Sequence, residues 1–405
     1  MKSLDEIFGE LGTDNAPGQE VRQTTQQCDD QKKGETLAGV PVDFSHGDVD
    51  AHPPTPGALE AWNQGFERGA AQAYTEYRGL DALRQRVSQD VAAFTGAPVD
   101  YTSELIITPG TQGALFLALG AVVTHGTKVV VIEPDYFANR KLVTFFGGIV
   151  MHVPLNYGDD ESNRGPDLNA LEKAFKDGAE VLIFSTPNNP TGTVTATHVI
   201  AQIATLAQTY DVTVVVDQLY ARMQYVAEDS YAHLRADQNA PKNIITILGP
   251  SKTESLSGFR LGVAFGTAVL VDRMEKLQAL VSLRAAGYNQ AALETWFREP
   301  EGWLQDRIAA HQAIRDDLLR LFNDAGLRTE RPNAGSYLYP RLPELAISLN
   351  DFVRFLREQA GVIVTPGTEF ARQDTDRIRL NFSQDHQASV AAAQRIIALA
   401  KRYAR

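Results

Sequence analysis

Short runs of consecutive apolar residues alternate with segments of helical periodicity along the first three quarters of the chain. The runs read LIIT, VVVIEP, VLIFS, VTVVVD, IITIL and LGVAF. Continuous apolar runs indicate strands of a parallel sheet that is covered on both faces, because a strand with one wet face would alternate. The order of runs and helices therefore predicts an α/β fold, with any functional site at the carboxyl ends of the strands.

The pattern also predicts how the chain divides. From about residue 301 it changes to a long helix, AGSYLYPRL, a second helix and the runs GVIVTPG and RIRLNFS. We therefore predict a large domain at residues 41–300, with a mostly parallel sheet between helices, and a smaller α+β domain at residues 301–405. Helices are predicted at residues 79–96, 111–123, 198–210, 304–325 and 349–360.

Residues 1–40 form a third region, which we interpret as an N-terminal arm on a neighbouring subunit or a lid over the functional site. Ser3 and Glu6 make a capping box ahead of a short amphipathic stripe. The stretch from residue 13 to residue 35 is polar and rich in turn residues. It therefore predicts no packed core of its own.

The candidate functional residues are polar side chains that stand where the apolar runs end. Asp217 closes VTVVVD, Tyr220 follows three residues later, and Asn189 lies in TPNNPTG behind VLIFS. Lys252 follows IITIL across a Gly-Pro-Ser turn, and Arg379 lies within RIRLNFS. Because the carboxyl ends of parallel strands meet at one edge of a sheet, we expect these side chains to share one pocket.

This set matches the needs of a pyridoxal phosphate enzyme. A lysine amine forms an imine with the cofactor aldehyde, and a buried carboxylate keeps the ring nitrogen protonated. Lys252 and Asp217 suit these two roles. The ring oxygen needs hydrogen-bond donors, which the Asn189 amide and the Tyr220 hydroxyl supply. Arg379 has the fork geometry for a substrate carboxylate.

A phosphate site is predicted where ELIITPG meets the helix that follows it. Gly110, Thr111 and Gln112 stand at the helix N-terminus, where free N–H groups and the helix dipole favour an anion. Ser251 and Arg260, both from GPSKTESLSGFR, are expected to complete the phosphate cup.

With these residues in hand, the chain resembles the class I/II aminotransferases, which are fold-type-I pyridoxal phosphate enzymes. The resemblance runs from about residue 41 to residue 383. TPNNPTG is similar to the family's NPxNPTG, DQLY to its D-x-x-Y, and GPSK-x7-R to its SxSK-x7-R. It implies that Lys252 is the imine lysine and that Arg260 binds the phosphate.

The resemblance implies roles for three further residues. Tyr136 in EPDYF stacks on the cofactor ring, Gly47 in SHGD lines the substrate site, and Tyr74 reaches the phosphate of the neighbouring subunit. One departure is Gly249, where the family often has a hydroxyl. A phosphate hydrogen bond worth about 1 kcal/mol is therefore missing or comes from elsewhere, such as Thr253.

The implied function is transamination between an L-amino acid and a 2-keto acid, through an internal aldimine at Lys252, in a homodimer with shared active sites. The resemblance also implies that the start of the large-domain segment folds with the small domain. Family members that use the same carbanion differently stay open: an oxidase or hydroxylase of a cationic amino acid, a decarboxylase or a β-lyase. A non-enzymatic regulator is disfavoured, since the chain has no spare basic DNA-binding domain.

Two features of the sequence disagree about the substrate. Arg284, in SLRAAGYNQ, falls where members acting on acidic substrates have an arginine across the dimer interface. Asp48 and Asp50, in HGDVDAH, favour a cationic amino acid. His46 is either a hydrogen-bonded structural residue or a proton relay beside Gly47.

Composition limits the partners to small molecules and a second copy of the chain. The formal net charge of −12 argues against nucleic acid and anionic membranes. No stretch approaches the length of a membrane span, and the first twelve residues lack the form of a signal peptide. The single cysteine, Cys28, suits a cytoplasmic protein without disulfides. No metal site is predicted.

Overall fold

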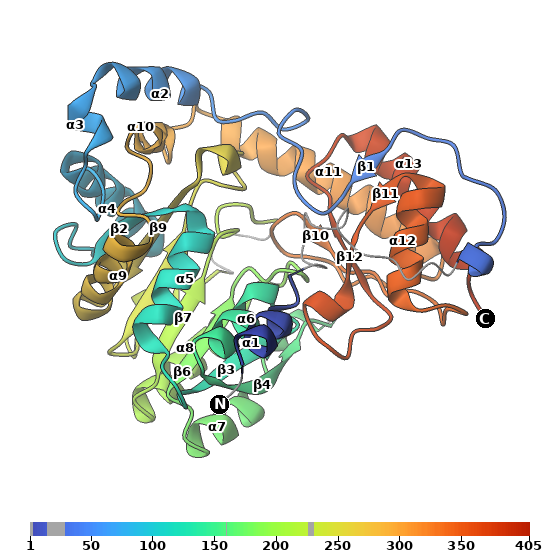
Figure 1. Ribbon diagram of the computed structural model, residues 1–405, viewed down its shortest axis with the longest axis horizontal. Coiled ribbons are helices and arrows are strands. Elements are labelled where there is room, and N and C mark those ends of the chain that lie inside the picture. Colours follow the sequence, from blue (N-terminus) through green and yellow to red (C-terminus); the bar gives the residue numbers. More distant parts are fainter. Residues whose placement is uncertain (1–2, 14–28, 159, 226–230) are drawn as a thin grey trace.

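The computed structural model describes residues 3–13, 29–158, 160–225 and 231–405 (Figure 1). Within these ranges the α-helices are α1 (Leu4–Leu11), α2 (Ala58–Glu67), α3 (Ala70–Ala73), α4 (Asp81–Thr95), α5 (Gly110–Val122), α6 (Phe137–Phe145), α7 (Leu168–Lys176), α8 (Thr197–Thr209), α9 (Ala268–Val281), α10 (Gly287–Gln290), α11 (Trp303–Asp324), α12 (Leu349–Ala360) and α13 (His386–Arg402). The strands are β1 (Val42–Asp43), β2 (Leu105–Pro109), β3 (Lys128–Glu133), β4 (Ile149–Asn156), β5 (Gly165–Pro166), β6 (Val181–Ser185), β7 (Thr213–Asp217), β8 (Ile244–Leu248), β9 (Leu261–Gly266), β10 (Tyr337–Leu338), β11 (Val362–Ile363), β12 (Thr365–Pro366) and β13 (Ile378–Asn381).

The central sheet of the described residues has the order β2-β9-β8-β7-β6-β3-β4-β5. Strands β4, β3, β6, β7 and β8 pair in parallel, whereas β9 is antiparallel to both of its neighbours and β5 is antiparallel to β4. The predicted mostly parallel sheet is confirmed, and all six apolar runs are strands. The run LGVAF, which forms β9, differs from the prediction only in that it runs antiparallel to its neighbours. Only a short 3-10 helix (Ser257–Phe259) and no α-helix separates β8 from β9, and the chain returns beside β8 in the opposite direction.

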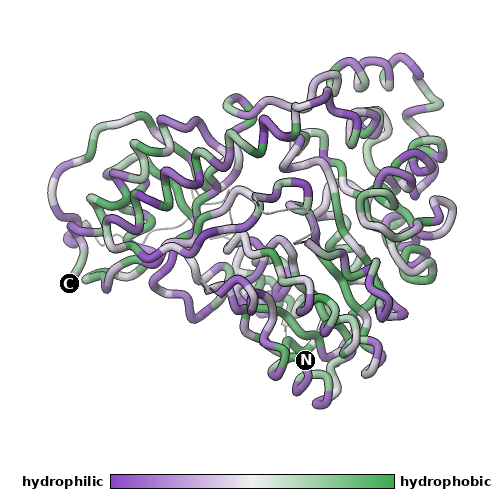
Figure 2. The backbone as a smooth tube through the Cα atoms, turned by 180° about the vertical axis from the view of Figure 1, so that it is seen from behind, coloured by the Kyte–Doolittle hydropathy of each residue, from purple (hydrophilic) through white to green (hydrophobic). Residues whose placement is uncertain are grey.

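Helices cover both faces of this sheet, which explains the continuous apolar runs. Successive side chains of a strand point to opposite faces. In β3, Val129 and Val131 pack with α5, α6 and α9, whereas Val130 and Ile132 pack with α7 and α8. Figure 2 shows hydrophobic residues concentrated along the strands. The five predicted helices all form, with ends within two residues of the predicted ones.

The C-terminal part has its own apolar cluster, built from α11, α12, α13 and the short strands β10 to β13. Val42 and Phe44, from far earlier in the chain, are buried in the same cluster as Phe352 and Ile396. Strand β1 pairs in parallel with β11, with Val42 opposite Val362. Segments that precede the large sheet in the sequence and segments that follow it therefore both contribute to this core.

The first helix, α1, lies against α6 of the same chain (Figure 1). Ser3 and Glu6 form the predicted capping box, since each side chain accepts the backbone N–H of the other. The rings of Phe8 and Phe145 meet edge to face, with centroids 6.3 Å apart. The described part of the arm thus contacts the helix that begins directly after Tyr136.

Two further expectations from the sequence concern a membrane span and the single cysteine. None of the described helices is long and apolar enough to cross a membrane. Cys28 and most of the polar stretch of the arm lie outside the described residues.

Candidate active site

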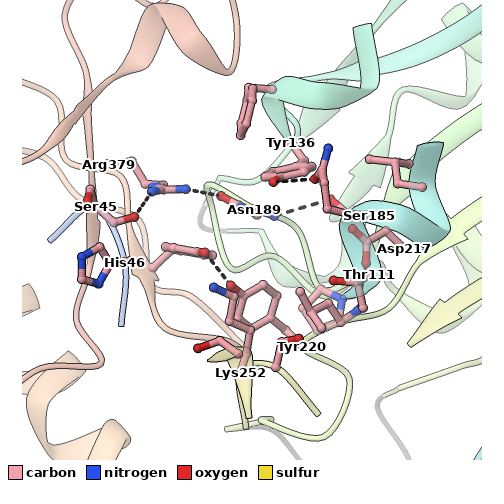
Figure 3. A pocket seen from close by; sticks show the side chains of 18 of the residues that line it. Ser45, His46, Thr111, Tyr136, Ser185, Asn189, Asp217, Tyr220, Lys252 and Arg379 are labelled. Atoms are coloured by element: carbon pink, nitrogen blue, oxygen red, sulfur yellow. Dashed lines mark hydrogen bonds between the residues drawn. The ribbon is translucent and has the colours of Figure 1, made fainter. Parts of the chain in front are cut away.

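A cavity of about 230 Å³ opens where the carboxyl ends of β6, β7 and β8 face β10 and β13 (Figure 3). Its walls come from the large sheet, from the C-terminal part and from the segment around Ser45. It brings together ten of the side chains singled out in the sequence: Thr111, Gln112, Tyr136, Asn189, Asp217, Tyr220, Ser251, Lys252, Arg260 and Arg379.

Asp217 ends β7, between β6 and β8, and its carboxylate points into the cavity (Figure 3). It accepts the backbone N–H of Leu219 at 3.0 Å, and no basic side chain of the described residues forms an ion pair with it. Burial raises the pKa of Asp217 to about 6, although that hydrogen bond acts in the opposite direction. A cation brought by a ligand would satisfy this carboxylate, and the protonated ring nitrogen of pyridoxal phosphate fits that need.

The part of the cavity at the start of α5 suits a phosphate. Helix α5 begins at Gly110, and its N-cap, Pro109, supplies no side-chain hydrogen bond to the first turn. Gly110 has φ +77°, and a Cβ there would lie 2.5 Å from Nη2 of Arg260. The guanidinium therefore lies against the open helix start, where N–H groups and a fixed cation together favour a dianion.

The glycine at position 249 has a packing reason. A Cβ there would lie 2.9 Å from Cγ2 of Thr111 and 3.2 Å from Cα of Gly262, so a hydroxyl-bearing residue does not fit without a shift. Ser257 adds a hydroxyl to the cavity, whereas Thr253 is buried and does not line it. Thr253 as the source of the missing hydrogen bond therefore stays a prediction, and Ser257 is a second candidate that the sequence analysis missed because its motif position carries no signal.

Arg379 is 1% exposed, so its guanidinium lies inside the protein and not at its surface. Its Nη1 donates to Oδ1 of Asn189 at 3.2 Å, and its Nη2 donates to the carbonyl of Ser45 at 2.7 Å and to Oγ1 of Thr365 at 3.3 Å. Nε has no partner among the described residues. A buried guanidinium whose partners are all neutral favours a carboxylate in the cavity.

His46 lies at the rim beside Asp43 (Figure 3 shows His46). Its Nε2 is 3.3 Å from Oδ2 of Asp43, and its Nδ1 is 3.0 Å from the carbonyl of Gly47. The hydrogen bond to Asp43 raises the pKa of His46 to about 9, against the effect of burial. His46 is therefore an imidazolium at neutral pH and donates hydrogen bonds. Gly47 lines an adjoining cavity of about 160 Å³, together with Asp48 and Lys252.

Two predicted site residues lie apart from both of these cavities. Tyr74 is 80% exposed at the end of α3. The guanidinium carbon of Arg284 lies 5.7 Å from the centroid of the Tyr74 ring and 5.6 Å from that of Tyr77. The structure therefore brings Tyr74 and Arg284 to each other on an exposed face. Their predicted roles depend on a second chain.

Sequence reasoning missed further residues that line the cavity. Tyr337 comes from β10, a strand of only two residues, and Ser185 ends β6. The available signal for Ser185 was its position directly before the TPNNPTG motif, whereas Tyr337 had no such signal. The remaining additions are Ser45, Leu115, Phe137, Pro187, Leu219 and Ser257.

Comparison with known proteins agrees with this geometry. The family model for aminotransferases of class I and II matches residues 41–396. The crystal structure of an aspartate aminotransferase from Rhodobacter sphaeroides is 55% identical, with a TM-score of 0.94 over 100% of both chains. The LL-diaminopimelate aminotransferase of Oleidesulfovibrio alaskensis is 27% identical over 91% of this chain and 95% of its own. The aspartate aminotransferase of Pyrococcus horikoshii is 26% identical over 80% and 82%. This chain belongs to the class I and II aminotransferases, and it is a pyridoxal phosphate-dependent aminotransferase.

Proposed function

We propose that the amino group is transferred in the cavity around Lys252, and that Lys252, Asp217 and Arg379 are its central residues. The observation that carries the proposal is that one cavity contains an amine, a half-buried carboxylate without an ionic partner among the described residues and a buried guanidinium. When bound there, pyridoxal phosphate supplies an electron sink for negative charge at the α-carbon of the substrate. Lys252 Nζ would move the proton from the α-carbon of the substrate to the cofactor carbon, and Asp217 would keep a proton on the ring nitrogen.

The remaining residues hold the cofactor. Asn189 and Tyr220 donate to the ring oxygen, and the Tyr136 ring lies against the ring face. The phosphate is held by the N-terminal turn of α5 and by side chains around Lys252, as the helix start and the fixed guanidinium support. These phosphate-binding residues are Gly110, Thr111, Gln112, Ser251 and Arg260, joined by Tyr74 of a second copy.

We propose an acidic amino acid as the amino donor, with Arg379 on its α-carboxylate. Gly47 and Asn189 also contact the substrate. The support comes from the 55% identical protein, which is named an aspartate aminotransferase, and from Arg284, which forms no ion pair within the described residues. Arg284 of a second copy would bind the side-chain carboxylate.

A cationic amino acid is the second candidate, because Asp48 lines the cavity that adjoins Lys252. An absorbance titration with aspartate, glutamate, arginine and lysine separates the two. The band followed is the visible absorbance band of the bound cofactor. Its loss on addition of aspartate or glutamate, reversed by a 2-keto acid, supports an acidic donor. A response to arginine or lysine alone would support a cationic donor, with Asp48 as the partner of its side chain.

The face around Tyr74 and Arg284 supports a homodimer. Tyr74, Leu280, Val281 and Leu283 are exposed there, and Leu280 has 86% of its surface accessible. Contact with a second copy would remove this apolar surface from water. Sedimentation at working concentration tests the assembly. A fully active monomer would contradict both the dimer and the shared site.

The remaining organisation stays a proposal as well. The shared apolar cluster supports a small domain at residues 301–405 that includes the segment near Val42, with the large domain at residues 41–300. The single cysteine of the sequence supports a cytoplasmic location. Deletion of residues 1–35 tests the lid, because unchanged turnover and substrate affinity would exclude it.

A further inference from the structure

We propose that Tyr337 is a positioning residue that couples the cofactor-side hydroxyl of Tyr220 to the substrate-side guanidinium of Arg379. The inference rests on the proposed function of the cavity. Tyr337 belongs to β10 in the C-terminal part, whereas Tyr220 follows β7 of the large sheet. One side chain thus contacts both halves of the proposed site.

The contact with Tyr220 is direct and buried. The two phenolic oxygens are 2.5 Å apart, and the rings meet at 71° with centroids 5.2 Å apart (Figure 3). Gly335, with φ +73°, lets the backbone before Tyr337 approach closely, because a Cβ there would lie 3.2 Å from Cδ1 of Tyr220. The pair is therefore built into the packing and is not a chance surface contact.

The contact with Arg379 uses the ring and not the hydroxyl. The guanidinium carbon lies 4.5 Å from the centroid of the Tyr337 ring and 4.9 Å from that of Phe370. Two aromatic rings thus hold the guanidinium by cation–π contacts while its nitrogens bond to neutral acceptors. This contact favours one orientation of the group that we propose for carboxylate binding.

The hydrogen-bond count gives the direction of the phenol pair. Burial raises the pKa of Tyr220 well above its ordinary value, so its hydroxyl keeps its single proton at neutral pH. If Tyr220 donates that proton to the cofactor ring oxygen, its own oxygen only accepts from Tyr337. Tyr337 then donates to Tyr220 and strengthens its donation, because linked hydrogen bonds polarise one another.

Removal of the Tyr337 hydroxyl leaves a weaker donor at the ring oxygen. That oxygen then carries more negative charge, and a proton on the neighbouring Lys252 nitrogen is held more tightly. The midpoint of the pH titration of the visible band therefore rises. Y337F is expected to raise it by about half a pH unit, with KM for the amino acid unchanged within about twofold.

Y337L removes the ring as well as the hydroxyl. It is expected to give the same rise in the midpoint and, in addition, a KM about fivefold higher, since the cation–π contact with Arg379 is lost. A KM that rises in Y337L but not in Y337F, with the same midpoint in both variants, distinguishes positioning from general destabilisation. The spectroscopic midpoint is read without turnover.

Y339F is the matched control, two residues along the chain. The Tyr339 hydroxyl donates to Asp374 at 2.7 Å, and Tyr339 does not line the cavity. This variant is expected to lose thermal stability and to keep the wild-type midpoint. In a Y220F background, Y337F is expected to add no further shift, because its effect passes through Tyr220.

The result that overturns the inference is a normal cofactor band in Y337F with an unchanged midpoint, or a full shift that persists in the Y220F background. An unchanged KM in Y337L overturns the half that concerns Arg379. A wild-type protein that develops no visible band with pyridoxal phosphate would overturn the proposed function itself, and this inference with it.

Discussion

The cavity around Lys252 and the exposed face around Tyr74 differ in how many of the predicted site residues a single chain brings together. Ten predicted residues meet in the cavity. Nine of them stand at strand ends of the large sheet, at the start of a helix or beside these points, and the tenth, Arg379, comes from β13 of the small C-terminal sheet. Tyr74 and Arg284 instead follow α3 and α9, and they contact each other away from the cavity. One chain therefore assembles the first group, whereas the second group would join a site only in the homodimer that we propose.

The two regions also differ in what they leave unsatisfied. The cavity holds charge, because the half-buried carboxylate of Asp217 and the buried guanidinium of Arg379 lack ionic partners among the described residues. The face exposes apolar side chains, including Leu280 and Tyr74. Buried unpaired charge favours a small charged ligand, and exposed apolar surface favours a protein partner.

The largest effect is expected from Lys252→Ala, which removes the proposed base of the cavity. Transfer of the amino group should fall by about 10⁴-fold, the upper range for loss of general base catalysis. Single-turnover absorbance after addition of the amino donor measures it. Lys276→Ala, which removes an exposed lysine paired with Asp272, is the control and should keep full activity. Residual turnover above a hundredth of wild type would contradict the role of Lys252.

Asp217→Asn tests the buried charge with a nearly isosteric change. We expect kcat about 100-fold lower, because the amide no longer offers a negative charge to the ring nitrogen. The affinity for pyridoxal phosphate should fall as well, which equilibrium dialysis of the cofactor-free protein measures. Unchanged affinity and rate would show that the carboxylate has only a structural role.

Subunit complementation tests the face. A heterodimer of Lys252→Ala and Arg284→Ala chains has one site with both defects and one site with neither. We expect such heterodimers to show about half of the wild-type activity, although the Lys252→Ala homodimer is inactive and the Arg284→Ala homodimer has a raised KM for acidic donors. Activity equal to the mean of the two parents would mean that Arg284 acts within its own chain.

The smallest expected effect concerns His46 at the rim of the cavity. Its pKa of about 9 lies above the ordinary 6.5, so its pair with Asp43 stabilises the folded state below pH 6.5, and this contribution disappears as the pH rises through 9. Because the side chain is largely exposed, the contribution stays below about 1 kcal/mol. Calorimetric melting of wild type and His46→Asn should differ at pH 6 and coincide above pH 9. A difference that grows with pH would contradict the raised pKa.

Prediction from sequence succeeded where local pattern and chain order were sufficient. The continuous apolar runs predicted six strands of the main sheet, because a strand buried on both faces carries its own signal. Strand β4 was missed, since IVMHVPLN mixes exposed and buried positions. The two-residue strands β10, β11 and β12 are too short to give a period, so Tyr337 carried no signal.

By itself, the sequence determined the α/β fold and the residues that stand at strand ends, because a strand buried on both faces appears as a continuous apolar run and the residues after it lie at its carboxyl end. Tertiary structure alone decided the reversed direction of β9, the burial of Arg379 and the pairing of Tyr220 with Tyr337. The two tyrosines are 117 positions apart, and their oxygens meet only because the C-terminal part packs against the large sheet. Such contacts depend on long-range packing, which no local pattern of residues encodes.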